Sequence, residues 1–360
     1  MLLIDLPMAH RPFFYEFPRL FRRRCFLRKR WRLLALGLLM VMLTGTVAAC
    51  EDQLSRHPSP SSAAPTENCR MVEHDVGTTE VCGQPQRIAV LAPHMLDILL
   101  SLGLQPAGYA EFTTTGLGEP TTEIPVLGDR VTSQPINLGL RNTPSLETLL
   151  QLNPDLIIGE AFQQQYYDRF SQIAPTLLFA GSQKDQWQRG LRGVAQAVDR
   201  QAQAEQVIQD YQQKLAETRA AIAAVVTTYP NLLLMTAFQL PETFGVTDGQ
   251  HFLGNLFEAL GFQLVLPAKG NASESWFSIE VLPELQADII LVFISDHLRE
   301  DAMNHIQQVW QQNPITRSLS TSQAGQVHFL EAYLFFNIRG PLAAQLILDQ
   351  VQDLFAPHRE

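Results

Sequence analysis

The stretch that decides the fold is Asp199-Arg-Gln-Ala-Gln-Ala-Glu-Gln-Val-Ile-Gln-Asp-Tyr-Gln-Gln-Lys-Leu215, which continues without glycine or proline as far as Pro230. Its apolar residues recur in steps of three and four, which predicts one amphipathic helix over 199–226, with Asp199 as its N-cap. At 1.5 Å per residue this helix would be roughly 40 Å long, longer than one small domain requires. We therefore interpret it as a strut between two α/β lobes. A long core helix and a coiled-coil segment are the alternatives.

The composition fits a globular chain with room for two domains. The chain has 360 residues, of which 46% are hydrophobic and 17% charged. Residues 1–49 hold nine of the 26 basic and two of the 36 acidic residues, which leaves 17 basic and 34 acidic residues and a formal net charge of −17 for 50–360. This excess of acid argues against a nucleic-acid partner and makes any arginine in a cleft conspicuous.

The first 49 residues have the pattern of an export signal. A basic segment, Arg22–Arg30, precedes the apolar run Leu33–Ala49. Val47-Ala48-Ala49-Cys50 resembles the lipobox of bacterial lipoproteins, which implies cleavage before Cys50, acylation of its thiol and tethering to the membrane on the periplasmic side. The pair Arg23-Arg24 resembles the start of a twin-arginine motif. An uncleaved anchor helix is the alternative.

Residues 50–68 are rich in serine, proline and alanine and are expected to form a flexible, lipid-anchored linker. Beyond it, Cys69 and Cys82 are the only cysteines left, and an oxidising compartment favours a disulfide between them. Such a bond would stabilise the entry to the domain by roughly 3 kcal/mol in the chain-entropy model. Two free buried thiols are the alternative.

Apolar strands alternate with helices on both sides of the strut, which predicts an N-terminal lobe at 69–198 and a C-terminal lobe at 227–360, each with a mainly parallel sheet. The residues between 111 and 143 are expected to form a polar loop. Strands are expected at 87–91, 106–109, 156–158, 176–179, 232–238, 288–294 and 326–330, and helices at 95–102, 145–152, 187–198, 251–260 and 341–355.

One segment of the chain is echoed in the other lobe. Ser145–Ile158 can be laid on Ser278–Leu291 without a gap, at a constant offset of 133 positions. Each copy reads as a serine-capped helix, a short turn and a buried strand that begins after an aspartate. This match predicts two similar lobes with a ligand cleft between them.

No catalytic constellation is present in the sequence. The motifs Gly-x-Ser-x-Gly, Gly-x-x-x-x-Gly-Lys-Ser/Thr and His-Glu-x-x-His do not occur, and the histidines are scattered without ligand spacing. We therefore predict a protein that is not an enzyme and that has neither a cofactor nor a resident metal.

The candidate ligand-binding residues follow the predicted strands, where open α/β sheets bind ligands. Arginine offers a planar fork for carboxylate or hydroxamate oxygens, and aromatic rings offer flat apolar walls. Ordinary packing, or a surface ion pair for Arg141, is the alternative for each residue taken alone. The set is His94, Tyr109, Arg141, Trp276, Arg299, Tyr333, Phe335, Phe336 and Arg339.

The exported part resembles the substrate-binding lipoproteins of bacterial iron–siderophore ABC transporters, of the ferric-citrate and ferrichrome-binding type. The block Arg141-Asn-Thr-Pro-Ser-Leu-Glu147 is the most specific match. Further matches are Gln86–Leu91, Leu96–Gly103, Asn153–Gly159, Gln172–Thr176, Asn313–Pro314 and Gly325–Leu330. At Asp199 this chain departs from relatives, which commonly have glycine between the two helices.

The resemblance implies two α/β lobes joined by a long helix, with a ferric siderophore as ligand in the cleft. It places Arg141 at the siderophore-binding arginine, and Glu147 and Glu280 at the pair of glutamates, one per lobe, that dock onto arginines of the permease dimer. For each glutamate, an acid that only complements a helix start is the alternative. We expect a monomer.

Two rival functions belong to other ligand or reaction classes. A haem- or cobalamin-binding protein of the same fold would use a cleft Tyr109 or His94 as an axial ligand or lid. An extracytoplasmic enzyme would need a nucleophile and a base that the sequence does not show.

Overall fold

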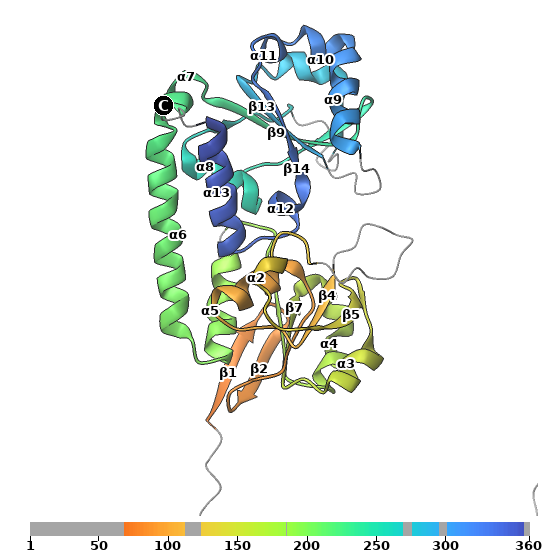
Figure 1. Cartoon of the computed structure of the whole chain (residues 1–360), viewed down its shortest axis with the longest axis vertical. Helices are drawn as coiled ribbons and strands as arrows, with labels where there is room; N and C mark the ends of the chain where they lie inside the picture. The colour runs from red at the N-terminus through yellow and green to blue at the C-terminus, as the bar shows by residue number, and fades with distance from the viewer. Residues whose placement is uncertain (1–67, 112–123, 185, 269–275, 295–300, 356–360) are drawn as a thin grey trace, which may run out of the picture. The chain divides into compact units, whose positions relative to one another are not determined.

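The computed structural model describes residues 68–111, 124–184, 186–268, 276–294 and 301–355 (Figure 1). The export signal, Cys50 and Arg299 lie outside these ranges. The described residues belong to one compact unit, Pro65–Glu360. Within them, no helix combines the length and the apolar character needed to cross a membrane.

The N-terminal lobe is built on a six-stranded sheet in the order β6-β5-β4-β3-β7-β8. All neighbouring strands are parallel except β5 and β6. The strands are β3 (Ile88–Val90), β4 (Gly108–Glu111), β5 (Ile136–Leu140), β6 (Thr143–Pro144), β7 (Leu156–Glu160) and β8 (Thr176–Phe179). Strands β5 and β6 were not expected, because they lie at the end of the segment that reads as a polar loop.

Helices cover both faces of this sheet. They are α2 (Pro93–Ser101), α3 (Leu146–Leu152), α4 (Tyr167–Ser171) and α5 (Gln186–Ala197), with 3₁₀ turns η1 (Gly128–Arg130) and η2 (Ala161–Tyr166). The serine cap expected before α3 is present, because Ser145 Oγ accepts a hydrogen bond from the backbone N–H of Thr148.

The C-terminal lobe repeats this architecture around a second sheet, in the order β12-β10-β9-β13-β14 with β11 beside β9. Strands β11, β9, β13 and β14 are parallel, and β10 and β12 are antiparallel. The strands are β9 (Asn231–Gln239), β10 (Thr243–Val246), β11 (Gln263–Leu264), β12 (Trp276–Ser278), β13 (Ile289–Ile294) and β14 (Val327–Glu331). The α/β prediction with mainly parallel sheets is therefore confirmed.

The helices of this lobe are α8 (Phe252–Leu260), α9 (Ala302–Gln312), α10 (Pro314–Ser318), α11 (Ser320–Gln323), α12 (Ala332–Phe336) and α13 (Pro341–Phe355). The segment after Ser278 forms the 3₁₀ turn η3 (Ile279–Glu284) rather than the expected α-helix. Pro283 lies inside this turn, and a proline removes a backbone donor and crowds the preceding turn of an α-helix.

The aspartates of the internal repeat have the same role in both lobes. Asp155 accepts hydrogen bonds from the backbone N–H groups of Gln86 and Arg87, each at 2.8 Å, just before β3. Asp288 accepts one from the N–H of Asn231 at 2.9 Å, at the start of β9. Each carboxylate therefore fixes the beginning of the neighbouring parallel strand.

The connecting segment is two helices rather than one. Helix α6 (Gln201–Ala221) is followed by α7 (Ala223–Thr228), with Ile222 between them. The N-cap of α6 is Arg200, so the prediction that Asp199 caps it is wrong. Asp199 has a positive φ of 58° and separates α5 from α6, a conformation that glycine adopts most easily. An aspartate tolerates it better than most residues do.

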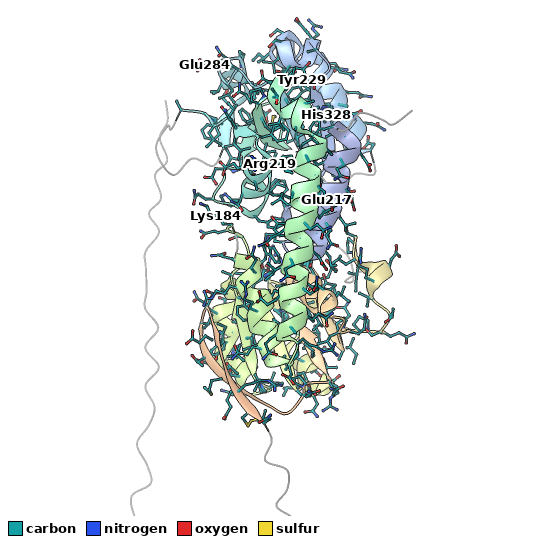
Figure 2. All side chains as sticks on the ribbon, turned by 90° about the vertical axis from the view of Figure 1, so that its left-hand side faces the viewer. Lys184, Glu217, Arg219, Tyr229, Glu284 and His328 are labelled. Atoms are coloured by element: carbon teal, nitrogen blue, oxygen red, sulfur yellow. A yellow bond between two sulfur atoms is a disulfide. The ribbon has the colours of Figure 1, made fainter. Side chains whose placement is uncertain are left out.

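Helix α6 runs alongside α13 and joins the two lobes (Figures 1 and 2). Lys214 forms an ion pair with Asp349 at 2.5 Å, and Gln352 Nε2 donates to Thr218 Oγ1 at 2.8 Å. One hydrophobic cluster extends from α2 and α5 of the first lobe through α6 to α8 and α13 of the second. The two lobes therefore share one hydrophobic core.

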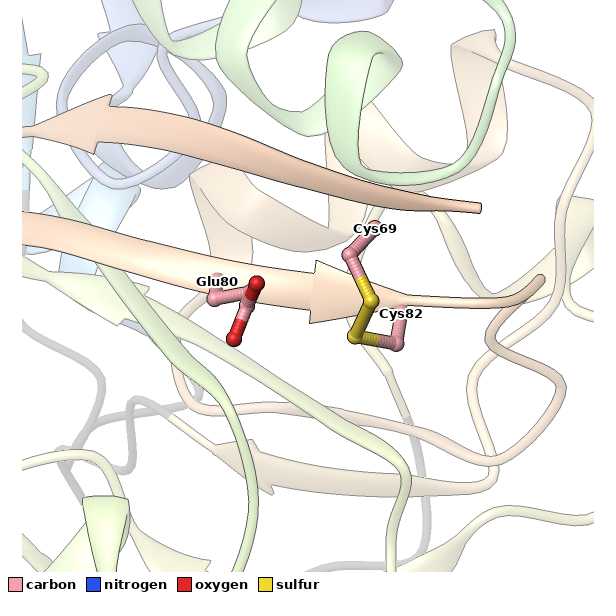
Figure 3. A group of neighbouring side chains, drawn as sticks. All are labelled: Cys69, Glu80 and Cys82. Atoms are coloured by element: carbon pink, nitrogen blue, oxygen red, sulfur yellow. A yellow bond between two sulfur atoms is a disulfide. The ribbon is translucent and has the colours of Figure 1, made fainter. Parts of the chain in front are cut away.

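An antiparallel hairpin, β1 (Cys69–His74) and β2 (Gly77–Cys82), precedes the first lobe. Its first and last residues are joined by the expected disulfide, Cys69–Cys82 (Figure 3). The Arg70 guanidinium donates to the carbonyls of Gly83 and Ala197, which fastens the hairpin to the end of α5.

Candidate ligand-binding site

Three polar side chains meet at the carboxyl edge of the N-terminal sheet. Glu160 is the last residue of β7, His94 lies in the first turn of α2, and Arg141 follows β5. Glu160 Oε1 is 3.0 Å from His94 Nδ1, and Arg141 donates to Glu160 Oε2 at 2.9 Å. The Glu160 side chain is 5% exposed and that of Arg141 16%, so the pair is largely shielded from water.

Arg339 of the C-terminal lobe completes this cluster. It follows α12 and donates a hydrogen bond to Glu160 Oε1. Its side chain is 15% exposed. The two arginines therefore reach one buried carboxylate from opposite lobes, and we call Glu160, Arg141 and Arg339 the shared-carboxylate cluster.

The protonation states of the cluster follow from its contacts. Burial alone would raise the pKa of Glu160, but the contacts with His94, Arg339 and Arg141 lower it to about 2. Burial lowers the pKa of His94, although Glu160 opposes this shift. Glu160 is thus ionised at neutral pH, and the buried imidazole is neutral.

A second contact between the lobes lies beside the first. Tyr333 of α12 donates its hydroxyl proton to Glu111 Oε1 at the end of β4, at 2.9 Å. Burial raises the pKa of Tyr333, and the adjacent Glu111 raises it further. Burial, with Tyr333 and Glu111 nearby, also raises the pKa of Tyr109. Both tyrosines are therefore phenols that can donate hydrogen bonds.

Two cavities flank these contacts. The larger, of about 630 Å³, is lined by Tyr109, Glu111 and residues of the segment 124–137. The smaller, of about 290 Å³, is lined by Trp276, Phe335, Phe336, Arg339 and part of α8. The smaller cavity has mainly apolar walls with a few polar groups, as is typical of ligand pockets, whereas the walls of the larger one include several polar side chains.

Two side chains of η2 hold Arg141 in place. Gln163 donates to the backbone carbonyl of Arg141 at 2.6 Å, and it accepts from the N–H of Glu160 at 2.8 Å. The Arg141 guanidinium lies 5.3 Å from the centre of the Phe162 ring, which is 47% exposed. These contacts, together with the bond to Glu160, fix the position of Arg141.

The structure brings most of the predicted ligand-binding residues to this region. Arg141 and His94 belong to the cluster or touch it, and Tyr109 lines the larger cavity. Tyr333 bonds to Glu111 beside the cluster. Trp276, Phe335, Phe336 and Arg339 line the smaller cavity.

The two glutamates expected to dock lie elsewhere. Glu147 and Glu280 are both exposed, in the first turns of α3 and η3. Ser278 caps η3 through a bond to the N–H of Glu280, as Ser145 caps α3.

Sequence reasoning missed the acids of the site. Glu160 and Glu111 directly follow the apolar runs of β7 and β4, which is the position that the rule for open sheets identifies. The prediction rests on arginines and aromatic residues, which fit an anionic chelate, and therefore does not include carboxylates at the same edge.

One group of side chains has the spacing of metal ligands, Cys69, Glu80 and Cys82. Both sulfurs are held in the disulfide and are not available as thiolates (Figure 3). His94 is fully buried and Tyr109 is 5% exposed. Neither presents an accessible axial ligand, which disfavours haem or cobalamin binding through these residues.

Two α/β lobes joined by a helix, with polar contacts between them and cavities beside these contacts, fit a ligand-binding protein. The periplasmic binding protein family model matches residues 88–334, and the chain belongs to this family. The prediction of a substrate-binding protein is thereby confirmed, and such proteins bind ligands rather than transform them.

Relatives extend the likeness over nearly the whole chain. A probable siderophore-binding lipoprotein of Bacillus subtilis, YfiY, is 27% identical and covers 91% of this chain and 99% of its own length. The Fe(3+)-citrate-binding protein YfmC of the same organism is 23% identical over 86% of this chain and 92% of its own. The crystal structure of Staphylococcus aureus SirA complexed with staphyloferrin B has a TM-score of 0.64 at 22% identity, and covers 81% of this chain and all of that one.

Proposed function

We propose that this protein is the extracytoplasmic binding component of an ABC importer, and that it captures a ferric siderophore and delivers it to a membrane permease. The observation that carries the proposal is the convergence of Arg141 and Arg339, from opposite lobes, beside two cavities, of which the smaller has aromatic walls. Relatives named as siderophore- and ferric-citrate-binding proteins support it.

The proposed binding mode uses the geometry of the arginines. A guanidinium is a planar cation with several N–H donors, a geometry that suits the oxygens of an iron chelate, so the two arginines that meet at Glu160 are the groups proposed to face those oxygens. Trp276 and Phe336, which line the smaller cavity, would contact the organic arms. The ferric chelate is the cargo, and no cofactor is part of the proposal.

The proposal is tested by titrating the purified protein with ferric chelates and following the fluorescence of Trp276, which is 41% exposed at the smaller cavity. A charge-assisted hydrogen bond contributes roughly 1.5–3 kcal/mol, so Arg141→Ala should weaken binding by about ten- to a hundredfold. Arg189→Ala is the matched control, because Arg189 pairs with Asp75 in an exposed salt bridge. An unchanged dissociation constant in the Arg141 variant would show that Arg141 does not contribute to chelate binding.

We also propose that Cys50 is the acylated mature N-terminus and that the protein is anchored to the cell envelope. The lipobox-like sequence and the relative named as a lipoprotein support this. Cys50→Ala should yield a soluble or unprocessed protein on membrane fractionation, whereas normal cleavage and membrane retention of the variant would contradict the proposal.

Docking onto the permease is proposed to use Glu147 and Glu280. Their equivalent, exposed positions after the capping serines of the two lobes support it. Matched charges on separate lobes would orient the protein on a two-fold permease dimer, and would contribute more to specificity than to affinity.

A further inference from the structure

The shared-carboxylate cluster carries a formal charge of only +1, because Glu160 offsets one of its two arginines. We propose that Glu160 is a specificity-determining residue that makes the site select ferric chelates of low net charge over strongly anionic ones. This inference rests on the proposed function and names the substrate class of the same site.

The first support is the position of Glu160. It is 4% exposed, and its two oxygens are shared by Arg141, Arg339 and His94. The Gln163 side chain accepts a hydrogen bond from the backbone N–H of Glu160 and donates to the backbone carbonyls of Leu91 and Arg141, which fixes the backbone around Glu160. The carboxylate cannot turn into solvent without breaking its hydrogen bonds with Arg141 and Arg339. A buried carboxylate held between two guanidiniums stays in place as a permanent negative charge.

The second support is the acid beside the larger cavity. Glu111 lines that cavity, is 4% exposed and accepts the Tyr333 hydroxyl. Among the described residues, the two arginine charges are thus opposed by Glu160, and two further acids, Glu111 and the exposed Asp129, line the larger cavity. Arg141, Arg339 and Glu160 sum to a formal charge of +1, and each ionised acid of the larger cavity lowers this sum by one.

Ferric chelates differ widely in net charge. Three hydroxamates each contribute one negative charge and neutralise Fe³⁺, whereas three catecholates contribute two each and leave the complex at −3. In a site sheltered from water, like charges repel strongly and a mismatch of charge is costly. A site whose charges sum to +1 or less fits the neutral complex and opposes the trianionic one.

The test compares dissociation constants for ferrichrome, a neutral trihydroxamate complex, and ferri-bacillibactin, a triscatecholate, by quenching of Trp276. The parent should bind ferrichrome more tightly. Glu160→Gln keeps the size of the side chain and removes its charge, so the ratio of the two constants should shift toward the triscatecholate by about tenfold or more. Glu160→Asp, which keeps the charge, should retain the parental ratio even where both affinities fall.

The control is Glu217→Gln, which removes the same charge from the exposed face of α6 (Figure 2) and should leave the ratio unchanged. If Glu160→Gln does not fold, Glu111→Gln provides the second variant and should shift the ratio in the same direction. A parent that prefers the triscatecholate, or a ratio unaffected by the loss of either acid, overturns this inference while leaving siderophore binding intact. A parent that binds neither complex overturns the proposed function as well.

Discussion

Asp97 Oδ2 accepts a hydrogen bond of 2.7 Å from the backbone N–H of Ala343, a residue 246 positions later in the other lobe. Its second oxygen accepts from the N–H of Leu342 at 3.0 Å. A side chain of α2 thus caps α13, whose first backbone donors have no partner within their own helix. Gly340 packs so closely on this carboxyl group that a Cβ there would lie 2.5 Å from Asp97 Oδ1.

Asp97→Ala is expected to destabilise the protein. The variant leaves the N–H groups of Leu342 and Ala343 without their acceptor at a buried junction, and each unsatisfied donor costs about 1–3 kcal/mol. The free energy of unfolding is measured by urea titration. Asp155→Ala is the matched control, because Asp155 also accepts from two backbone N–H groups but at an exposed position. Equal losses in the two variants would contradict a special contribution from the contact between the lobes.

The same carboxyl group makes stability depend on pH. Burial raises the pKa of Asp97 to about 7, although the bonds from Leu342 and Ala343 and the charge of Arg130 oppose this shift. A raised pKa in the folded state means that folding favours the protonated acid. The contribution of Asp97 to the unfolding free energy is therefore greatest below the unfolded pKa of about 3.9 and falls as pH rises through about 7.

Asp97→Asn cannot titrate and serves as the reference for this effect. Relative to it, the parent should lose unfolding free energy between pH 5 and pH 8, measured by urea titration at each pH. A difference between parent and variant that stays constant over this range would show that the Asp97 carboxyl group does not titrate there.

The disulfide should stabilise the hairpin at the start of the domain. Cys69 and Cys82 are 13 positions apart, and closing a loop of this size contributes about 3 kcal/mol in the chain-entropy model. The double variant Cys69→Ser with Cys82→Ser should lower the thermal midpoint while leaving chelate affinity unchanged, because the hairpin does not line either cavity. Reduction of the parent with dithiothreitol should give the same midpoint as the double variant. A parent that shows no difference before and after reduction would contradict this expectation.

Local sequence patterns predicted the elements that are long or strongly apolar. The runs at Thr176–Phe179 and Pro341–Phe355 have the expected bounds, because continuous burial and a proline at the first turn leave little ambiguity. The prediction of an α-helix after Ser278, in the second copy of the repeat, is wrong. This segment contains Pro283 and forms a 3₁₀ turn. Strand β5 was missed because its pairing with β4 depends on a parallel partner distant in the sequence.

The sequence predicted the arginines of the candidate site but not the contacts that they make with Glu160. Sequence position places Arg141 and Glu160 after different strands, and only the folded sheet brings them within 2.9 Å. The pairing of Arg339 with Glu160 joins residues 179 positions apart in two lobes, and no local pattern contains that information. Nor does the sequence show that His94 and Tyr109 are buried, which is what weighs against their use as axial ligands.

The repeated glutamates give the last prediction. Glu147 and Glu280 are exposed and lie at helix starts, where an acid is favourable by under about 1 kcal/mol through the helix dipole alone. Stabilisation by the helix dipole can explain an acid at each position taken alone. It does not explain why both lobes have a glutamate at the equivalent position. The double variant Glu147→Ala with Glu280→Ala should therefore leave chelate affinity intact and abolish uptake of radiolabelled iron in cells that depend on this protein.

The matched control for this experiment is Asp168→Ala with Asp353→Ala, which removes one exposed acid from each lobe at positions outside the repeat. The control changes the net charge by the same amount. An uptake defect seen only in the Glu147 and Glu280 variant would therefore result from the position of these two acids and not from the loss of charge. Each single variant should keep part of the uptake, since one correctly placed charge still steers the encounter. If the double variant takes up iron at the parental rate, the docking role is wrong, and both glutamates only complement their helix starts.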